Sequence, residues 1–259
     1  MMKRWMFLVL LTLLVVGAVG VSAQDDATAS TITFNPVTFT FGPEIAQGVF
    51  SLQSAGTPPE APAAPGGPVP PGSYFTFSGT ATAPGMYTQG NDNLYVFPVS
   101  GFAQYPADSP VNQELAALQT LLADQPDLAG FPGLPYLPLA TGGFAFIAQA
   151  EYLETDTLTG VRYLTSIRQD VGESLDGQVQ YVFQGLTKDG QYVVSLRYFV
   201  LTGVLPTTPT ADLNYDEFAA NYNQYIADIT AQLNELDADA YTPSLNALDA
   251  FVGTVTVAG

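Results

Sequence analysis

The alternation of apolar and polar residues is clearest over residues 143–206, where four alternating runs are separated by breaks rich in glycine and aspartate. Such runs predict the strands of an antiparallel sheet. Asp189 and Gly190 form the tightest break, and an Asp-Gly pair favours a type I′ turn because both of its residues take positive φ. A two-residue loop at this point places Lys188 opposite Gln191 and fixes the register of the flanking strands.

That register gives the hairpin two different faces. One face is apolar and is predicted to be core; it carries Val179, Tyr181 and Phe183 against Tyr192, Val194, Leu196, Tyr198 and Val200. The other face is mixed; it carries Gln180, Val182, Gln184, Leu186 and Lys188 against Gln191, Val193, Ser195, Arg197 and Phe199. A mixed face predicts partial cover by a helix.

The rest of the chain supplies further strands and several helices. Alternation predicts strands at residues 31–41 (interrupted by Pro36), 73–78, 93–99 and 254–257, and a strand or single turn at 45–52. Helical spacing predicts helices from Ser109-Pro110 to Pro126, over residues 212–236 and from Thr242-Pro243 to Gly253, with residues 130–138 as a surface loop. This order predicts an α+β fold, a central mostly antiparallel sheet flanked by helices.

The beginning of the chain predicts export. Residues 1–23 combine a basic start, an apolar run and small residues at Val21-Ser22-Ala23, which is typical of a secretory signal peptide cleaved after Ala23. The alternative is an uncleaved membrane anchor. Residues 24–30 then form a flexible lead-in, and residues 31–259 form one domain. We expect an extracytoplasmic protein with no membrane span after cleavage.

A proline-rich stretch at residues 56–72 interrupts the domain. It contains no aromatic or β-branched cluster that could pack, so it predicts an extended, solvated loop. A proline-motif ligand is the alternative.

The net charge and the residue types that the chain lacks reduce the number of functions that it can have. The chain carries 24 acidic and six basic residues, with a formal net charge of −18, which disfavours nucleic acid as a partner. It contains neither histidine nor cysteine, which excludes Ser-His-Asp and Cys-His machinery and metal sites built on those residues. Lys188, the single lysine outside the signal peptide, lies at a hairpin tip, where burial cannot activate it. We expect no cofactor and no metal.

Carboxylates leave two hypotheses open. Glu151 is the best candidate for a glycosidase-like pair, and the alternative is an acid at the margin of the sheet facing solvent. Residues 212–216 begin like a calcium loop, but Glu217 replaces the turn glycine and Asn223 the bidentate glutamate, so a helix start is the preferred interpretation.

Three arginines in the predicted sheet are the most informative polar residues. Arg162 and Arg168 lie six residues apart, so an unbroken strand would place both on one face. Arg197 shares the mixed face with Gln180 and Gln184. The hypothesis is a cationic pocket for an anionic ligand; the alternative is internal pairing of the arginines with Glu151, Glu154 or Asp170. Tyr136, Tyr152 and Tyr163 either form a binding groove or pack in the core.

Three segments resemble patterns of a known fold. Residues 160–170 (GVRYLTSIRQD) and 181–195 (YVFQGLTKDGQYVVS) are similar to motifs of an uncharacterised family of secreted bacterial proteins. Their pattern, together with residues 243–257 (PSLNALDAFVGTVTV), is loosely similar to the PsbP-like fold. The resemblance implies an α/β/α sandwich with the last helix across the sheet. It also implies a non-enzymatic assembly or binding role, and it carries over no functional residue.

Together these observations predict a secreted, non-enzymatic binding or scaffolding domain, expected to be a monomer. The expected ligand is an extracellular protein or a small molecule. The alternative is an extracytoplasmic hydrolase that acts on a glycan through carboxylates.

Overall fold

A computed structural model describes residues 28–59, 67–80, 91–129, 131 and 133–259. The predicted signal peptide, residues 24–27 of the lead-in and the middle of the proline-rich loop lie outside the described residues. The two ends of the proline-rich loop are described, and a hydrogen bond of 2.8 Å from the Thr57 amide to the Val69 carbonyl joins them.

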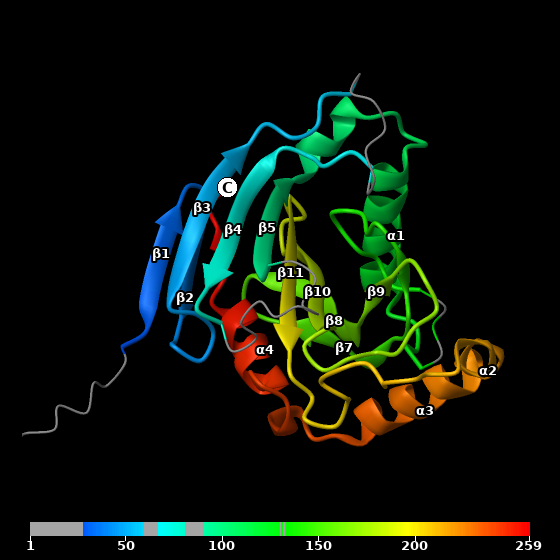
Figure 1. The fold of residues 1–259 in the computed structure, drawn as a ribbon. Coiled ribbons are helices and arrows are strands. Elements are labelled where there is room, and N and C mark those ends of the chain that lie inside the picture. Colours follow the sequence, from blue (N-terminus) through cyan, green and yellow to red (C-terminus); the bar gives the residue numbers. More distant parts are fainter. Residues whose placement is uncertain (1–27, 60–66, 81–90, 130, 132) are drawn as a thin grey trace, which may run out of the picture.

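The predicted α+β class is confirmed by a seven-stranded antiparallel sheet with several helices (Figure 1). In spatial order its strands are β3 (Gly48–Ser54), β4 (Gly72–Ser78), β5 (Asn93–Pro98), β11 (Tyr192–Val200), β10 (Val179–Thr187), β8 (Leu158–Thr165) and β7 (Ala148–Glu154). Smaller sheets are formed by β1 (Ser30–Phe34), β2 (Val37–Phe41) and β12 (Thr256–Val257), and by β6 (Gly143–Phe144) and β9 (Ile167–Arg168).

The helices are divided between the two faces of the large sheet. One face carries α1 (Pro110–Asp124), which follows the 3-10 helix η1 (Val99–Gln104). The opposite face carries α3 (Tyr222–Glu235), α4 (Leu245–Gly253) and the small β1-β2-β12 sheet; α2 (Tyr215–Ala220) precedes α3, and the 3-10 helix η2 (Ala238–Ala240) precedes α4.

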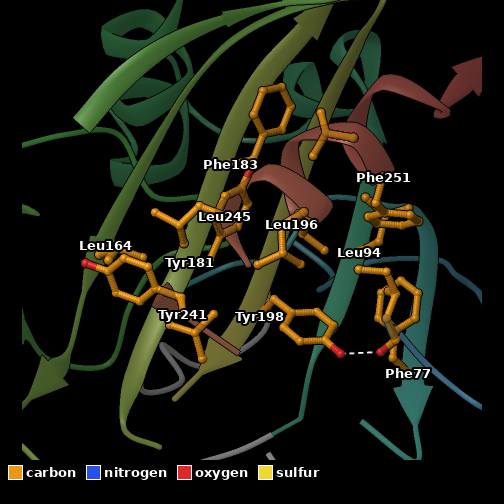
Figure 2. Close-up of a cluster of buried hydrophobic side chains, with 14 of the residues drawn as sticks. Phe77, Leu94, Leu164, Tyr181, Phe183, Leu196, Tyr198, Tyr241, Leu245 and Phe251 are labelled. Atoms are coloured by element: carbon orange, nitrogen blue, oxygen red, sulfur yellow. Dashed lines mark hydrogen bonds between the residues drawn. The ribbon is translucent and has the colours of Figure 1, made fainter. Parts of the chain in front are cut away.

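The larger core lies between the sheet and α4. Figure 2 shows Leu245 and Phe251 of α4 among Leu94, Tyr181 and Leu196 of the sheet, all of them buried. The face predicted as core is therefore the face that α4 covers. The mixed face is covered by α1, whose Val111, Leu115, Leu118 and Leu121 are buried, so the prediction of helical cover is confirmed.

The register of the central hairpin is also confirmed, but its turn is not of the expected type. Phe183 lies opposite Leu196, and the same register extends from Val179 to Leu186. Gly190 takes a φ of 70°, whereas Asp189 is absent from the residues with positive φ. The Gly190 amide donates to the Thr187 carbonyl at 2.7 Å, and Asp189 uses its carboxylate to accept from the Thr187 hydroxyl instead.

Two predicted elements are each divided in the structure. Residues 31–41 form the hairpin of β1 and β2, because Pro36 sits in a turn and not in a continuous strand. Residues 212–236 form α2 and α3, separated at Asn221, whose side-chain amide donates to the Glu217 carbonyl at 2.9 Å. Asp212 has a φ of 59° and precedes α2, which Asn214 caps by accepting from the Glu217 amide.

Candidate functional site

The segment that follows α1, residues 133–144, packs against the sheet and does not run over the surface as the sequence predicts. Leu134, Tyr136 and Leu137 are buried, since this segment brings its own apolar side chains to the mixed face of the sheet. Residues 133–142 form no strand, so their backbone groups need partners other than a neighbouring strand.

Side chains of the sheet supply those partners. The Gln184 amide accepts from the Leu137 amide at 3.0 Å and donates to the Leu137 carbonyl at 3.2 Å, as a paired strand would. The Ser195 hydroxyl donates to the same carbonyl at 2.5 Å, and the Tyr163 hydroxyl donates to the Pro135 carbonyl at 2.8 Å. Polar residues on the mixed face therefore hold this segment in place.

Arg197 and Gln180 hold the aromatic ring of this segment. The guanidinium of Arg197 lies 3.8 Å from the centre of the Tyr136 ring and 5.4 Å from that of Tyr95, and it donates to the Pro138 carbonyl. The Tyr136 hydroxyl donates to the Gln180 side-chain oxygen at 2.8 Å. Burial raises the pKa of Tyr136, although Arg197 lowers it in part, so this hydroxyl stays a hydrogen-bond donor.

A groove of about 1040 Å³ opens between α1 and this segment. Most of the described lining is apolar, and none of the described lining residues is basic. The lining residues are Gly67, Pro110, Glu114, Ala116, Ala117, Thr120, Leu121, Asp124, Pro126, Phe131, Gly133, Leu134, Pro135, Tyr136, Leu139, Ala140, Gly142 and Phe144.

Two carboxylates, those of Glu114 and Asp124, lie on the α1 side of the groove. Glu114 accepts a hydrogen bond of 3.3 Å from the Tyr136 amide, which links the two walls. Burial raises the pKa of Glu114, and the Tyr136 amide lowers it by a smaller amount. A positive group in the groove would favour the ionised form of this carboxyl.

The opposite face of the sheet holds two more of the predicted residues, Arg162 and Glu151. The buried guanidinium of Arg162 contacts Glu151 at 2.6 Å and Asp249 of α4 at 3.4 Å. Tyr181 donates to Asp249 at 2.7 Å, and burial raises the pKa of Asp249 while Tyr181 and Arg162 lower it in part. Glu151 itself is mostly exposed, with 67% of its side chain accessible. This group joins α4 to the sheet.

Arg168 does not share a face with Arg162 as predicted. The strand ends at Thr165, and Arg168 belongs to the small β6-β9 sheet, where it donates to the Glu173 carbonyl at 2.7 Å and pairs with Asp170 at 3.4 Å. The predicted internal pairing is thus observed for Arg162 with Glu151 and for Arg168 with Asp170.

The six residues predicted to bind a ligand are therefore distributed over separate places. Gln180, Gln184 and Arg197 lie beneath the groove and support its wall, while Arg162, Glu151 and Arg168 lie elsewhere.

Sequence reasoning missed Glu114, although its position on the predicted helix was available as a signal. Of the three tyrosines considered for a groove, Tyr136 lines it and Tyr163 is fully buried.

Comparison with known proteins gives no assignment, since no family model, no curated protein and no solved structure matches the chain. Within the described residues, no helix is both long enough and apolar enough to span a bilayer. The same residues contain no cluster of three or more His, Cys, Asp or Glu side chains suited to a metal ion.

Proposed function

We propose that this chain is an exported, non-enzymatic binding domain whose ligand site is the groove between α1 and residues 133–144. The observation that carries the proposal is the composition of the groove, whose lining, as far as the structure describes it, combines apolar side chains with two carboxylates and no basic side chain. The wall is held rigidly by the sheet, through Gln184, Ser195 and Arg197. A preorganised wall reduces the entropic cost of binding.

The dimensions of the groove favour a small ligand. Its volume of about 1040 Å³ lies at the upper end of the range of small-molecule sites. Phe131, Tyr136 and Phe144 offer aromatic surface to an apolar ligand, in the way that such sites usually do.

The charge of the groove favours a cation. Glu114 and Asp124 face an apolar space in a chain whose net charge is −18, so an anionic amphiphile is repelled and a cationic one is attracted. Aromatic rings beside the carboxylates add attraction for a quaternary ammonium group. We therefore assign the site to a small amphiphile with an apolar tail and a positively charged head.

The carboxylate-dependent hydrolase receives less support. Glu114 and Asp124 are ten residues apart on one helix, about 15 Å along its axis, which exceeds the roughly 6.5–9.5 Å that inverting glycosidases use. Glu151 and Asp249 are both paired with Arg162, which leaves neither free to act as a base.

Export and the PsbP-like fold are parts of the same proposal. Export is supported by the signal-like pattern of residues 1–23. The packing of α4 across the large sheet supports the PsbP-like arrangement, to which the comparisons add nothing.

Calorimetric titration with dodecyltrimethylammonium, below its micellar concentration, tests the proposal. We expect binding that is lost in Ala117→Trp, because the indole fills the groove, and kept in the matched control Ala123→Trp, because Ala123 lies on the exposed side of α1. Glu114→Gln should weaken binding several-fold, and dodecyl sulfate should not bind at this site. Equal binding of both amphiphiles, or equal loss in both tryptophan variants, contradicts the proposal.

A further inference from the structure

The two outer strands of the large sheet differ in how their free edges are protected. β7 carries a bulge between Ala148 and Glu151 and the exposed side chains of Glu151 and Glu154. In addition, α3 contacts this edge, where the Gln149 amide donates to the Asn234 side chain at 2.6 Å. Bulges, charges and covering elements are the features that prevent further strand pairing.

β3, at the other end of the sheet, contains neither a bulge nor a charged residue. Its sequence GVFSLQS contains no charged residue and no proline, and it pairs regularly with β4 over all seven residues. Among the described residues no strand is hydrogen-bonded to its outer edge. Every second residue of such an edge directs its N–H and C=O groups outward, where they can pair with another strand.

Two large apolar side chains mark this edge. Phe50 is 66% exposed and Leu52 is 49% exposed, and both lie on one face of β3 because they are two residues apart. Val49 packs against the core, so Phe50 and Leu52 point to the opposite face of the sheet. An exposed apolar pair on an unpaired edge is typical of a surface that another strand covers.

The spacing of this pair is self-complementary. If two copies of β3 pair antiparallel with Ser51 at the symmetry axis, Phe50 of one copy lies opposite Leu52 of the other. The two-fold axis generates the same contact twice. Aromatic–aliphatic pairs across antiparallel strands stabilise such a register.

The negative charge of the protein opposes contact between two copies everywhere except at the uncharged strand β3. Two chains of net charge −18 repel each other over most of their surfaces, whereas β3 brings no charge into the contact. Repulsion between the rest of the two chains is screened by salt, so the association should strengthen as the salt concentration rises. An interface held by ion pairs would weaken instead.

We propose that β3 pairs antiparallel with β3 of a second copy and that the two large sheets join into one continuous sheet in a homodimer. The contact is centred on Ser51, and on each side of it Phe50 of one copy packs against Leu52 of the other. This replaces the monomer expected from the sequence and does not depend on the groove.

Sedimentation velocity of the purified protein tests the proposal, from about 1 µM to about 300 µM protein and from about 0.05 M to about 0.5 M NaCl. We expect a monomer–dimer equilibrium that shifts towards dimer at high salt. Phe50→Lys should raise the dissociation constant at least about tenfold, whereas Leu213→Lys, which changes an exposed leucine outside the sheets, should leave it unchanged.

The double variant Phe50→Lys/Leu52→Glu tests the register itself. It sets each new ammonium opposite the new carboxylate of the other copy, so it should recover part of the affinity lost in Phe50→Lys. Circular dichroism checks that all variants fold, which we expect because both side chains are exposed. The proposal is overturned if the protein is a monomer at every concentration. It is also overturned if β3 of such a monomer pairs with another protein instead. A dimer that Phe50→Lys leaves intact, or one that the double variant does not recover, overturns it as well.

Discussion

Individual polar side chains inside this protein satisfy the backbone of an irregular segment. Gln184 is fully buried, yet its amide replaces a neighbouring strand for Leu137 by both accepting and donating. Arg197 donates to the carbonyl of the next residue, Pro138, while Gln180 accepts from the side-chain hydroxyl of the preceding residue, Tyr136. Their burial is therefore explained by the segment that they hold.

The variant Gln184→Leu should lower the free energy of unfolding by about 1–3 kcal/mol, because it leaves the Leu137 amide buried without a partner. Urea denaturation measures the change. Gln191→Leu, at an exposed site on the same hairpin, should change stability by no more than about 0.5 kcal/mol. Equal stability of the two variants would show that the Leu137 amide finds another partner.

At these positions the sequence predicted the face but not the role. Alternation placed Gln180, Gln184 and Arg197 together on the mixed face, since period-two spacing fixes which side of a strand each residue occupies. It could not show that residues 135–138 would lie over them, because that contact joins segments about forty to sixty residues apart along the chain. A polar sheet residue that supports a loop and one that binds a ligand have the same local pattern.

The last turn of α3 is held by side chains from outside the helix, those of Gln149 and Tyr241. Only Ile229 and Leu233 of this helix are buried. Its last turn is held by the side chain of Gln149, which donates to the Leu233 carbonyl at 2.9 Å and to the Leu236 carbonyl at 2.8 Å. Helix ends leave such carbonyls without intrahelical partners.

Gln149→Ala should therefore loosen α3 selectively. We expect faster hydrogen exchange over residues 222–235, while exchange in β10 and α1 stays unchanged, because opening is local. Hydrogen-exchange mass spectrometry measures this, and Gln232→Ala, an exposed change on the same helix, is the control. A uniform increase across the fold would instead indicate a global loss of stability.

Strands and helices were predicted best where periodicity was uninterrupted. β10 and β11 were expected in place because the turn at Asp189-Gly190 fixes their register, and α1 and α4 because their apolar residues recur at helical spacing. Errors arose at local interruptions. Pro36 turned one expected strand into the β1-β2 hairpin, and the bond from the Asn221 side chain to the Glu217 carbonyl accompanies the break between α2 and α3. Ser109 precedes α1 as expected but makes no capping bond.

Across the fold, buried carboxyls make stability depend on pH. Burial raises the pKa of Glu114 and Asp249, and it raises that of Asp92 from 3.8 to about 6. A carboxyl whose pKa is higher in the folded state keeps its proton on folding, so its stabilisation is present at low pH and is lost as the pH rises. The pKa values of Glu154 and Asp189 are lowered, but both are fully exposed and act weakly.

The free energy of unfolding should therefore decline between about pH 4 and about pH 6.5. Asp92→Asn should be more stable than the parent protein at pH 8, by at most about 3 kcal/mol, because the amide still accepts from the Phe199 amide without a buried charge. The difference should vanish near pH 4, where Asp92 is protonated. Urea denaturation across this range measures it, with Asp108→Asn as an exposed control. A difference that grows towards low pH would contradict the assignment.

The central claim is that the groove between α1 and residues 133–144 is a ligand site, and backbone amide NMR tests it most directly. During titration with dodecyltrimethylammonium, we expect shifts concentrated in residues 114–124 and 133–144, lost in Ala117→Trp and kept in Ala123→Trp. Shifts confined to the exposed edge at Phe50 and Leu52, or spread evenly over the acidic surface, would contradict it.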